Sequence, residues 1–171
     1  MPQMEQAIDK LRLGERGHGT NGWVNLDSHE SADIVAHLPE LPRSVIERQW
    51  SRIEGIHVWE HLYKWDAEEL AAILCKILRP GGELVLECPN LEVACRALLG
   101  FGRDQDRYHM HVFYGDPQFQ DPSYTHRWGY TPATLTAQLI KYGGFRKEDV
   151  RIERARHHVP DRDFRIVARK R

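Results

Sequence analysis

The clearest pattern along the chain is an apolar stripe of helical spacing followed by a short strand-like run. Asp66 is predicted to cap the helix, with Glu69 three residues on as its capping-box partner. The stripe recurs at i, i+3, i+4, i+7 and i+8 as Leu70, Ile73, Leu74, Ile77 and Leu78. Pro80-Gly81-Gly82 should end this helix, and residues 83–88 are typical of a strand. Helix, tight turn and strand are half of a βαβ unit, which predicts an α/β fold with a mostly parallel sheet.

Shorter patterns predict the remaining elements. They indicate strands over 10–14, 23–27, 32–36 and 53–58, and helices over 44–50, 91–99 and 131–140. Residues 150–155 and 164–168 alternate with period two and predict a C-terminal antiparallel hairpin. The first two strands are separated only by a glycine-rich loop, which is shorter than the dozen or so residues that a parallel crossover usually needs. If these strands are parallel neighbours, the first crossover helix has been shortened to a loop.

Length and composition predict one domain over residues 1–171. Of the 171 residues, 41% are hydrophobic and 29% are charged, which fits one core and argues against disorder. The 24 Lys and Arg residues nearly balance the 25 Asp and Glu residues, so no overall field favours nucleic acid. The sequence shows no membrane-spanning run, no signal-peptide pattern and no paired-cysteine motif. We therefore expect a cytoplasmic protein without a membrane partner; the sequence indicates no oligomeric state.

The glycine-rich loop over 14–22 and the aspartate that follows it are candidates for ligand binding. Gly14 and Gly17 allow sharp turns that expose backbone N–H groups. Asp27 ends a predicted strand, where α/β sheets place ligand contacts. An ordinary surface turn and a turn-capping aspartate remain the alternatives. A dinucleotide site is disfavoured, because the order is Gly-x-x-Gly-x-Gly and Asp27 comes too early for the usual spacing of about 20 residues.

Five segments occur together in an order that is typical of a known family. They are the opening over 11–27, Val58-Trp59-Glu60-His61-Leu62, the turn Leu78-Arg79-Pro80-Gly81-Gly82-Glu83-Leu84, His126-Arg127-Trp128-Gly129-Tyr130-Thr131-Pro132, and Gly144-Phe145. In order and spacing they resemble short, type-11-like S-adenosylmethionine-dependent methyltransferases, over roughly residues 10–170. The resemblance implies a class I, Rossmann-like methyltransferase sheet and S-adenosylmethionine as the cofactor.

The resemblance also implies which residues form the site. Those implied for the cofactor are Gly14, Gly17, Asp27 and His37. His37 stands where the family often has an acidic residue for the adenine amino group. Glu60 and His61 would lie at the rim of the pocket, with His61 as a candidate base for an acceptor that carries a proton. Alternatively, these two residues simply begin a helix.

The segment over 100–130 is rich in aromatic residues and histidines and is predicted to be a lid or insert that shapes the acceptor pocket. The candidate acceptor-binding residues are His109, His111, Tyr114, His126 and Trp128. Alternatively, the aromatic side chains only fix the loop to the core, above all Trp128. His109 and His111 could bind a metal with His126 or Asp116, but no metal-binding motif accompanies them. We therefore predict no metal.

These patterns predict direct methyl transfer from S-adenosylmethionine to a small-molecule acceptor. A non-catalytic module that keeps the fold but has lost cofactor affinity is the alternative, favoured by Glu15 and Arg16 in the loop and by His37. A nucleic-acid methyltransferase is less favoured. The basic C-terminal stretch is expected to be a solvated face of the hairpin, and Pro89-Asn90 is not followed by the residues of a base-methylation motif.

Overall fold

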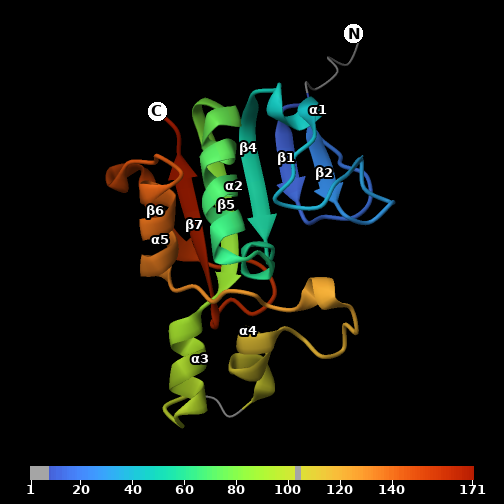
Figure 1. Cartoon of the computed structure of the whole chain (residues 1–171). Helices are drawn as coiled ribbons and strands as arrows, with labels where there is room; N and C mark the ends of the chain where they lie inside the picture. The colour runs from blue at the N-terminus through green and yellow to red at the C-terminus, as the bar shows by residue number, and fades with distance from the viewer. Residues whose placement is uncertain (1–7, 103–104) are drawn as a thin grey trace.

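The computed structural model describes residues 8–102 and 105–171, which surround one seven-stranded sheet (Figure 1). The strands are β1 (Lys10–Leu13), β2 (Trp23–Asp27), β3 (Ile34–Val35), β4 (Trp50–Ile56), β5 (Leu78–Pro89), β6 (Val150–Arg154) and β7 (Asp163–Arg169). Their order is β3-β2-β1-β4-β5-β7-β6. Neighbours among β1 to β5 are parallel, and β7 is antiparallel to both β5 and β6. The predicted α/β sheet with its C-terminal antiparallel hairpin is confirmed.

The helices follow the predicted order with shifted ends. They are α1 (Arg43–Ile46), α2 (Lys64–Ile77), α3 (Leu91–Leu98), α4 (Met110–Tyr114) and α5 (Pro132–Lys141), with 3-10 turns η1 (Trp59–His61), η2 (Asp106–Tyr108), η3 (Pro122–Tyr124) and η4 (Lys147–Asp149). In α5, Thr131 forms the N-terminal cap, as expected, and exchanges capping-box hydrogen bonds with Thr134. Helix α2 buries Leu70 and Leu74 completely, as the stripe predicted.

Several predicted boundaries are wrong. Helix α2 starts at Lys64 after the extended Tyr63, so Asp66 lies in its first turn and is not the cap. The predicted helix over 44–50 ends at Ile46, and Trp50 instead begins β4. The Trp50 indole is fully buried and donates to the carbonyl oxygen of Val45, a tertiary environment that outweighs the local helical pattern. Strand β5 already begins at Leu78, before the Pro-Gly-Gly turn.

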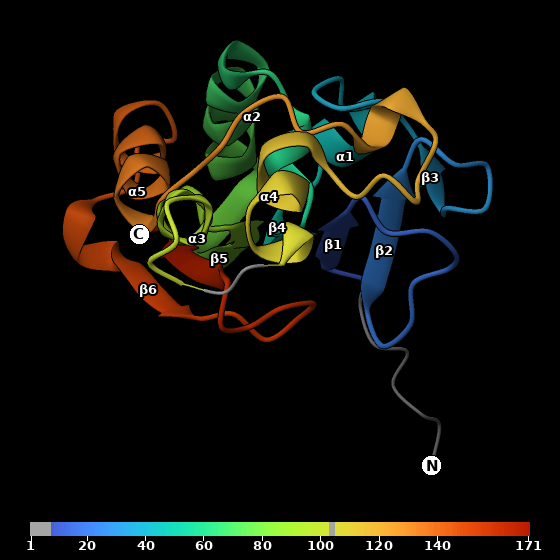
Figure 2. The same cartoon turned by 90° about the horizontal axis from the view of Figure 1, so that it is seen from below.

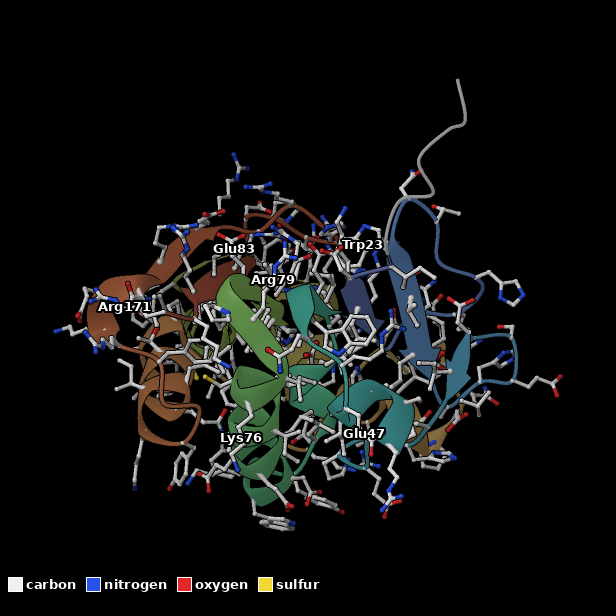
Figure 3. All side chains as sticks on the ribbon, turned by 90° about the horizontal axis from the view of Figure 1, so that it is seen from above. Trp23, Glu47, Lys76, Arg79, Glu83 and Arg171 are labelled. Atoms are coloured by element: carbon white, nitrogen blue, oxygen red, sulfur yellow. The ribbon has the colours of Figure 1, made fainter. Side chains whose placement is uncertain are left out.

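The two faces of the sheet differ in chemistry. Alternating residues such as Leu11, Leu84 and Ile166 are fully buried, and Figure 2 shows α1, α2 and α5 on one side of the sheet. Among the described residues no helix covers the other face, on which Trp23 and Glu83 lie away from α2 (Figure 3). Parallel sheets are usually apolar and covered on both sides. This sheet instead presents a charged face.

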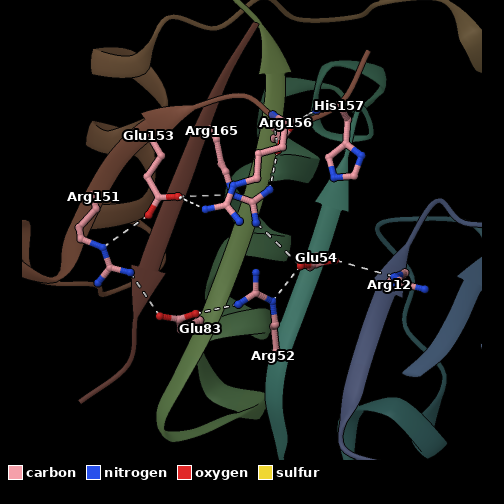
Figure 4. A network of polar contacts seen from close by, with 10 residues as sticks. Arg12, Arg52, Glu54, Glu83, Arg151, Glu153, Arg156, His157 and Arg165 are labelled. Carbon is pink, nitrogen blue, oxygen red and sulfur yellow. Dashed lines mark hydrogen bonds and ion pairs between the residues drawn. The ribbon is translucent and has the colours of Figure 1, made fainter. Parts of the chain in front are cut away.

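A network of ion pairs crosses that open face (Figure 4). Glu54 on β4 pairs with Arg12 on β1 and with Arg52, while Glu83 on β5 pairs with Arg52 and with Arg151 on β6. Beneath them, Arg165 on β7 is only 3% exposed and contacts the buried carboxylate of Glu87. The expectation that the C-terminal charges form a solvated face is therefore wrong for Arg162, Asp163 and Arg165, which are buried with their ionic partners.

The connection between β1 and β2 contains no helix, which confirms the shortened crossover. The Asp33 carboxylate organises this loop by accepting hydrogen bonds from the backbone N–H groups of Gly19 and Asn25 at 2.7 and 2.9 Å. Gly14 at the end of β1 donates its N–H to the Leu26 carbonyl oxygen, which fixes the start of the loop against β2. The loop therefore keeps two parallel strands side by side without a covering helix.

The described part of the segment over 100–130 runs across the carboxyl ends of the parallel strands (Figures 1 and 2). Its described part is not a structureless loop, because it contains η2, α4 and η3. Across residues 8–102 and 105–171, no helix combines the length and apolar character that a membrane crossing requires.

Candidate functional site

A cavity of about 520 Å³ lies where β1, β2, β3 and β4 end. Gly14 and Glu15 line it after β1, Asp27 at the end of β2 and His37 after β3. The chain turns at Gly14 with φ +69°, and a Cβ atom there would lie 2.4 Å from Cγ2 of Val58. Glycine suits this turn, because the backbone is left-handed and packs directly against Val58, the second residue after β4. We refer to this space as the strand-end cavity.

A second cavity of about 650 Å³ adjoins it at the carboxyl ends of β4 and β5. Glu60, His61 and Pro89 line its sheet side, while His111 and His126 come from the segment over 100–130. We refer to it as the insert cavity. Residues that line both cavities mark their junction, and they are Gly14, Glu15, His57, His61 and Tyr124. Two ligands bound in these cavities would meet at this junction.

His57 occupies a constrained position directly after β4. Its φ is +54°, and its ring lies between two carboxylates, with Nδ1 3.0 Å from Glu60 Oε1 and Nε2 3.1 Å from Asp163 Oδ2. Burial alone would lower the pKa of His57, but Asp163 and Glu60 outweigh it and raise the pKa to about 9. Burial would raise the pKa of Glu60, whereas the charge of His57 holds it well below its ordinary value. An imidazolium and two carboxylates therefore form a buried ionic cluster at the junction.

His61 and His126 contact each other through their rings. Their ring centroids are 4.8 Å apart with the rings edge to face. Burial and the proximity of His126 lower the pKa of His61, although the charge of Glu60 opposes this. His61 is therefore neutral near pH 7 and can accept a proton or supply a lone pair to another group.

Tyr124 forms the wall of both cavities on the side of the insert. Its hydroxyl group accepts a hydrogen bond of 2.6 Å from the Arg16 guanidinium. Its ring stacks on Phe119 at 4.7 Å and contacts His61 edge to face. The hydrogen bond between Arg16 and Tyr124 joins the glycine-rich loop to η3, so the insert is attached to the sheet at the carboxyl ends of β1 and β2. Tyr124 lies outside the set of site residues predicted from the sequence.

The structure gathers seven of the predicted site residues around the two cavities. They are Gly14, Asp27, His37, Glu60, His61, His111 and His126. The other four line neither cavity. Gly17 has no atom within 4 Å of where a Cβ would stand, Tyr114 and Trp128 are largely exposed, and the buried His109 accepts from the N–H of Met110 at the start of α4. Trp128 is also not buried in the core, since it is 44% exposed.

Two important members of the site lie outside the predicted set. His57 falls within the strand predicted over 53–58, but β4 ends at Ile56, so His57 follows the strand and belongs to the junction. Asp163 lies in the C-terminal hairpin, more than a hundred residues away from His57. Only the pairing of β7 beside β5 brings this carboxylate to the end of β4. No local pattern in the sequence signals such a contact.

Comparisons with known proteins add a fold-level finding. No protein-family model matches the chain, and no curated protein matches it in sequence. Among solved structures, a SAM-dependent methyltransferase from Archaeoglobus fulgidus has a TM-score of 0.59 at 17% identity, covering 99% of this chain and 89% of that one. The CcbJ methyltransferase from Streptomyces caelestis has a TM-score of 0.59 at 14% identity, covering 96% and 89%.

An O-methyltransferase family protein from Burkholderia thailandensis also has a TM-score of 0.59, at 11% identity. The match covers 96% of this chain and 51% of that protein. These neighbours share the α/β sheet with its antiparallel C-terminal strands. The chain therefore has the class I, Rossmann-like fold of SAM-dependent methyltransferases.

Proposed function

We propose that the protein is an S-adenosylmethionine-dependent methyltransferase that binds the cofactor in the strand-end cavity and a small-molecule acceptor in the insert cavity. The observation that carries this proposal is the placement of Gly14, Asp27 and His37 around one cavity at successive strand ends. Open α/β sheets bind ligands at this edge. A cofactor in the first cavity and an acceptor in the second would meet at His61.

The residues around the strand-end cavity fit the chemistry of the cofactor. The turn at Gly14 leaves room for a close approach to backbone, which the methionine end of the cofactor requires. Asp27 accepts a hydrogen bond from the N–H of His29 at 2.7 Å, and its carboxylate can accept further bonds from ribose hydroxyl groups. Glu15 adds a carboxylate beside a ligand whose sulfonium is positive. The loop has Glu15 and Arg16 between Gly14 and Gly17, and these two side chains line the cavity without closing it.

The chemistry required of the protein is alignment and removal of a proton. In methyl transfer, the acceptor atom attacks the methyl carbon as the carbon–sulfur bond breaks, and the electron pair stays on sulfur. The enzyme holds the two reactants in line, which is the main contribution of proximity. The neutral imidazole of His61 stands at the junction and can take the proton of an acceptor.

Titration calorimetry with S-adenosylhomocysteine tests the cofactor part of this proposal. We expect one binding site, with affinity at least tenfold weaker in Asp27→Ala. Glu30→Ala is the control and should bind like the parent, because the Glu30 carboxylate is exposed in the loop that follows β2. The absence of heat at millimolar ligand, or equal affinities in all three proteins, would overturn it. Formation of S-adenosylhomocysteine from the cofactor with a set of hydroxyl and amine acceptors then separates an enzyme from a module that only binds.

A further inference from the structure

Glu60, His61 and His126 converge in the wall of the insert cavity, and His61 also lines the strand-end cavity. Each offers one possible ligand atom, and these atoms all lie within 4.8 Å of one another. Glu60 and His61 come from η1, whereas His126 follows η3 in the insert. We propose that these three residues bind a divalent transition-metal cation, and that this cation positions a hydroxyl group of the acceptor.

The hydrogen bonds of the two imidazoles favour metal binding. His61 Nδ1 lies 3.3 Å from the Thr125 carbonyl oxygen, and His126 Nδ1 lies 2.9 Å from the Val112 carbonyl oxygen. A carbonyl oxygen can only accept, so the proton of each neutral ring must be on Nδ1. Each Nε2 then carries a lone pair. Metal-binding histidines typically have this arrangement, with the second ring nitrogen donating to a carbonyl or carboxylate.

The third candidate ligand is a buried carboxylate with unused acceptor capacity. Glu60 is 2% exposed, and within the described part of the chain neither of its oxygens has a hydrogen-bond partner of normal geometry, although the buried Cys88 thiol lies beside the carboxylate. Oε1 faces His57 Nδ1 in an ion pair. A buried carboxylate with unsatisfied oxygens is costly. A cation bound through Oε2 would remove that cost, and the same carboxylate would remain paired with His57.

Backbone contacts hold the three ligands in place without an ion. The N–H groups of Arg127 and Trp128 both donate to the Glu60 carbonyl oxygen, at 2.8 and 3.2 Å. The guanidinium of Arg127 donates to the carbonyl oxygen of His61. These bonds join the residues that follow His126 directly to η1. Preorganisation of this kind is what a metal site requires of its supporting residues.

The ligand set indicates the type of cation. Two imidazoles and one carboxylate suit zinc, cobalt, iron or manganese better than magnesium or calcium, which prefer oxygen ligands. Three protein ligands leave open coordination positions, as in catalytic metal sites. All three residues line the insert cavity, so the open positions face the space assigned to the acceptor.

The role of the cation in catalysis rests on the proposed function. With the cation bound, His61 Nε2 would be a ligand and could not also act as the base. A hydroxyl oxygen bound to the cation would instead become more acidic and lose its proton to solvent more readily. That oxygen then attacks the methyl carbon, the new carbon–oxygen bond forms, and the carbon–sulfur bond breaks with its electron pair on sulfur. The site therefore favours an oxygen nucleophile, and the product is a methyl ether.

Cobalt(II) titration of the chelator-treated protein, followed by visible absorption, tests the site directly. We expect ligand-field bands that saturate at one equivalent. His61→Gln and His126→Gln should each weaken binding at least tenfold, because each removes an imidazole ligand. His29→Gln is the matched control, since His29 is exposed in the β2–β3 loop, and it should bind cobalt like the parent.

Thermal unfolding without metal and with metal separates a loss of metal binding from a loss of folding. Thermal unfolding without metal shows whether each variant is folded, and saturating metal should raise the unfolding temperature of the parent but not of His126→Gln. The absence of bands at millimolar cobalt, or bands of equal strength in the parent and both variants, would overturn the proposal. Neither readout needs the cofactor, so failure of metal binding and failure of S-adenosylhomocysteine binding are separate results.

Discussion

His57 Nε2 lies 3.1 Å from Asp163 Oδ2 and connects the residue after β4 to the first residue of β7. The Asp163 side chain is fully buried and the His57 side chain is 14% exposed. The contact joins the parallel part of the sheet to the antiparallel hairpin at the edge where both cavities open. Its ionic character makes the stability of this edge depend on pH.

We expect the metal-free protein to lose stability as pH rises from about 6.5 to above 9. The pKa of His57 is raised from 6.5 to about 9, so its contribution is fully present below 6.5 and disappears as pH rises through 9. This difference corresponds to about 3 kcal/mol. Urea unfolding at pH 6 and at pH 9.5, in a chelating buffer, measures the change.

His57→Asn is the informative variant for this prediction. Asparagine tolerates the left-handed φ of +54° better than most residues, so it removes the charge with little backbone strain. The variant should be less stable than the parent at pH 6 and nearly equal to it at pH 9.5. A variant that follows the same pH dependence as the parent would show that His57 does not titrate as described.

Gly14 and Gly17 make a matched pair, because both have φ near +70° and only one has a close neighbour. Alanine at either position should cost roughly 1 kcal/mol through the left-handed backbone. Gly14→Ala also places a methyl group against Val58 and the cavity wall, so it should lower S-adenosylhomocysteine affinity as well. Gly17→Ala should leave that affinity unchanged. Equal affinities of the two variants would contradict the cavity assignment.

The charged face supplies a prediction about stability alone. Arg165→Ala leaves the fully buried Glu87 without its cation and should cost about 3–5 kcal/mol. Arg151→Ala removes a half-exposed partner of Glu83 in the same network and should cost less than about 1 kcal/mol. Chemical unfolding of both variants measures the difference. Equal losses of unfolding free energy in the two variants would contradict the claim that the buried ion pair of Arg165 contributes more than the exposed one of Arg151.

The fold could be predicted largely because its strongest signals are local. The α2 stripe and the period-two hairpin each specify one element, and the short connection between the first two strands indicated the missing crossover helix. The prediction for Trp50 was wrong because its burial and its hydrogen bond to the Val45 carbonyl oxygen depend on tertiary packing. Arg165 was misassigned because period-two alternation does not reveal that one face of the sheet carries a buried ionic layer.

The site could be predicted best where a residue lies at or just beyond the carboxyl end of a strand. Gly14 follows β1, Asp27 ends β2 and His37 lies two residues after β3, and all three line the strand-end cavity. The prediction of no metal is not tested by the structure. The sequence did not indicate that His61 and His126 are neighbours, because only the return of the insert to η1 brings them together. The same limitation hid Asp163, whose role depends on strand order.

The central claim is that this chain binds S-adenosylmethionine at the carboxyl ends of β1, β2 and β3. Nuclear magnetic resonance titration of the labelled protein with S-adenosylhomocysteine tests it most directly. We predict saturable shifts of the backbone amides of Gly14, Asp27 and His37, with little change on β6. The absence of shifts at millimolar ligand, or shifts confined to residues away from these strand ends, would contradict the account.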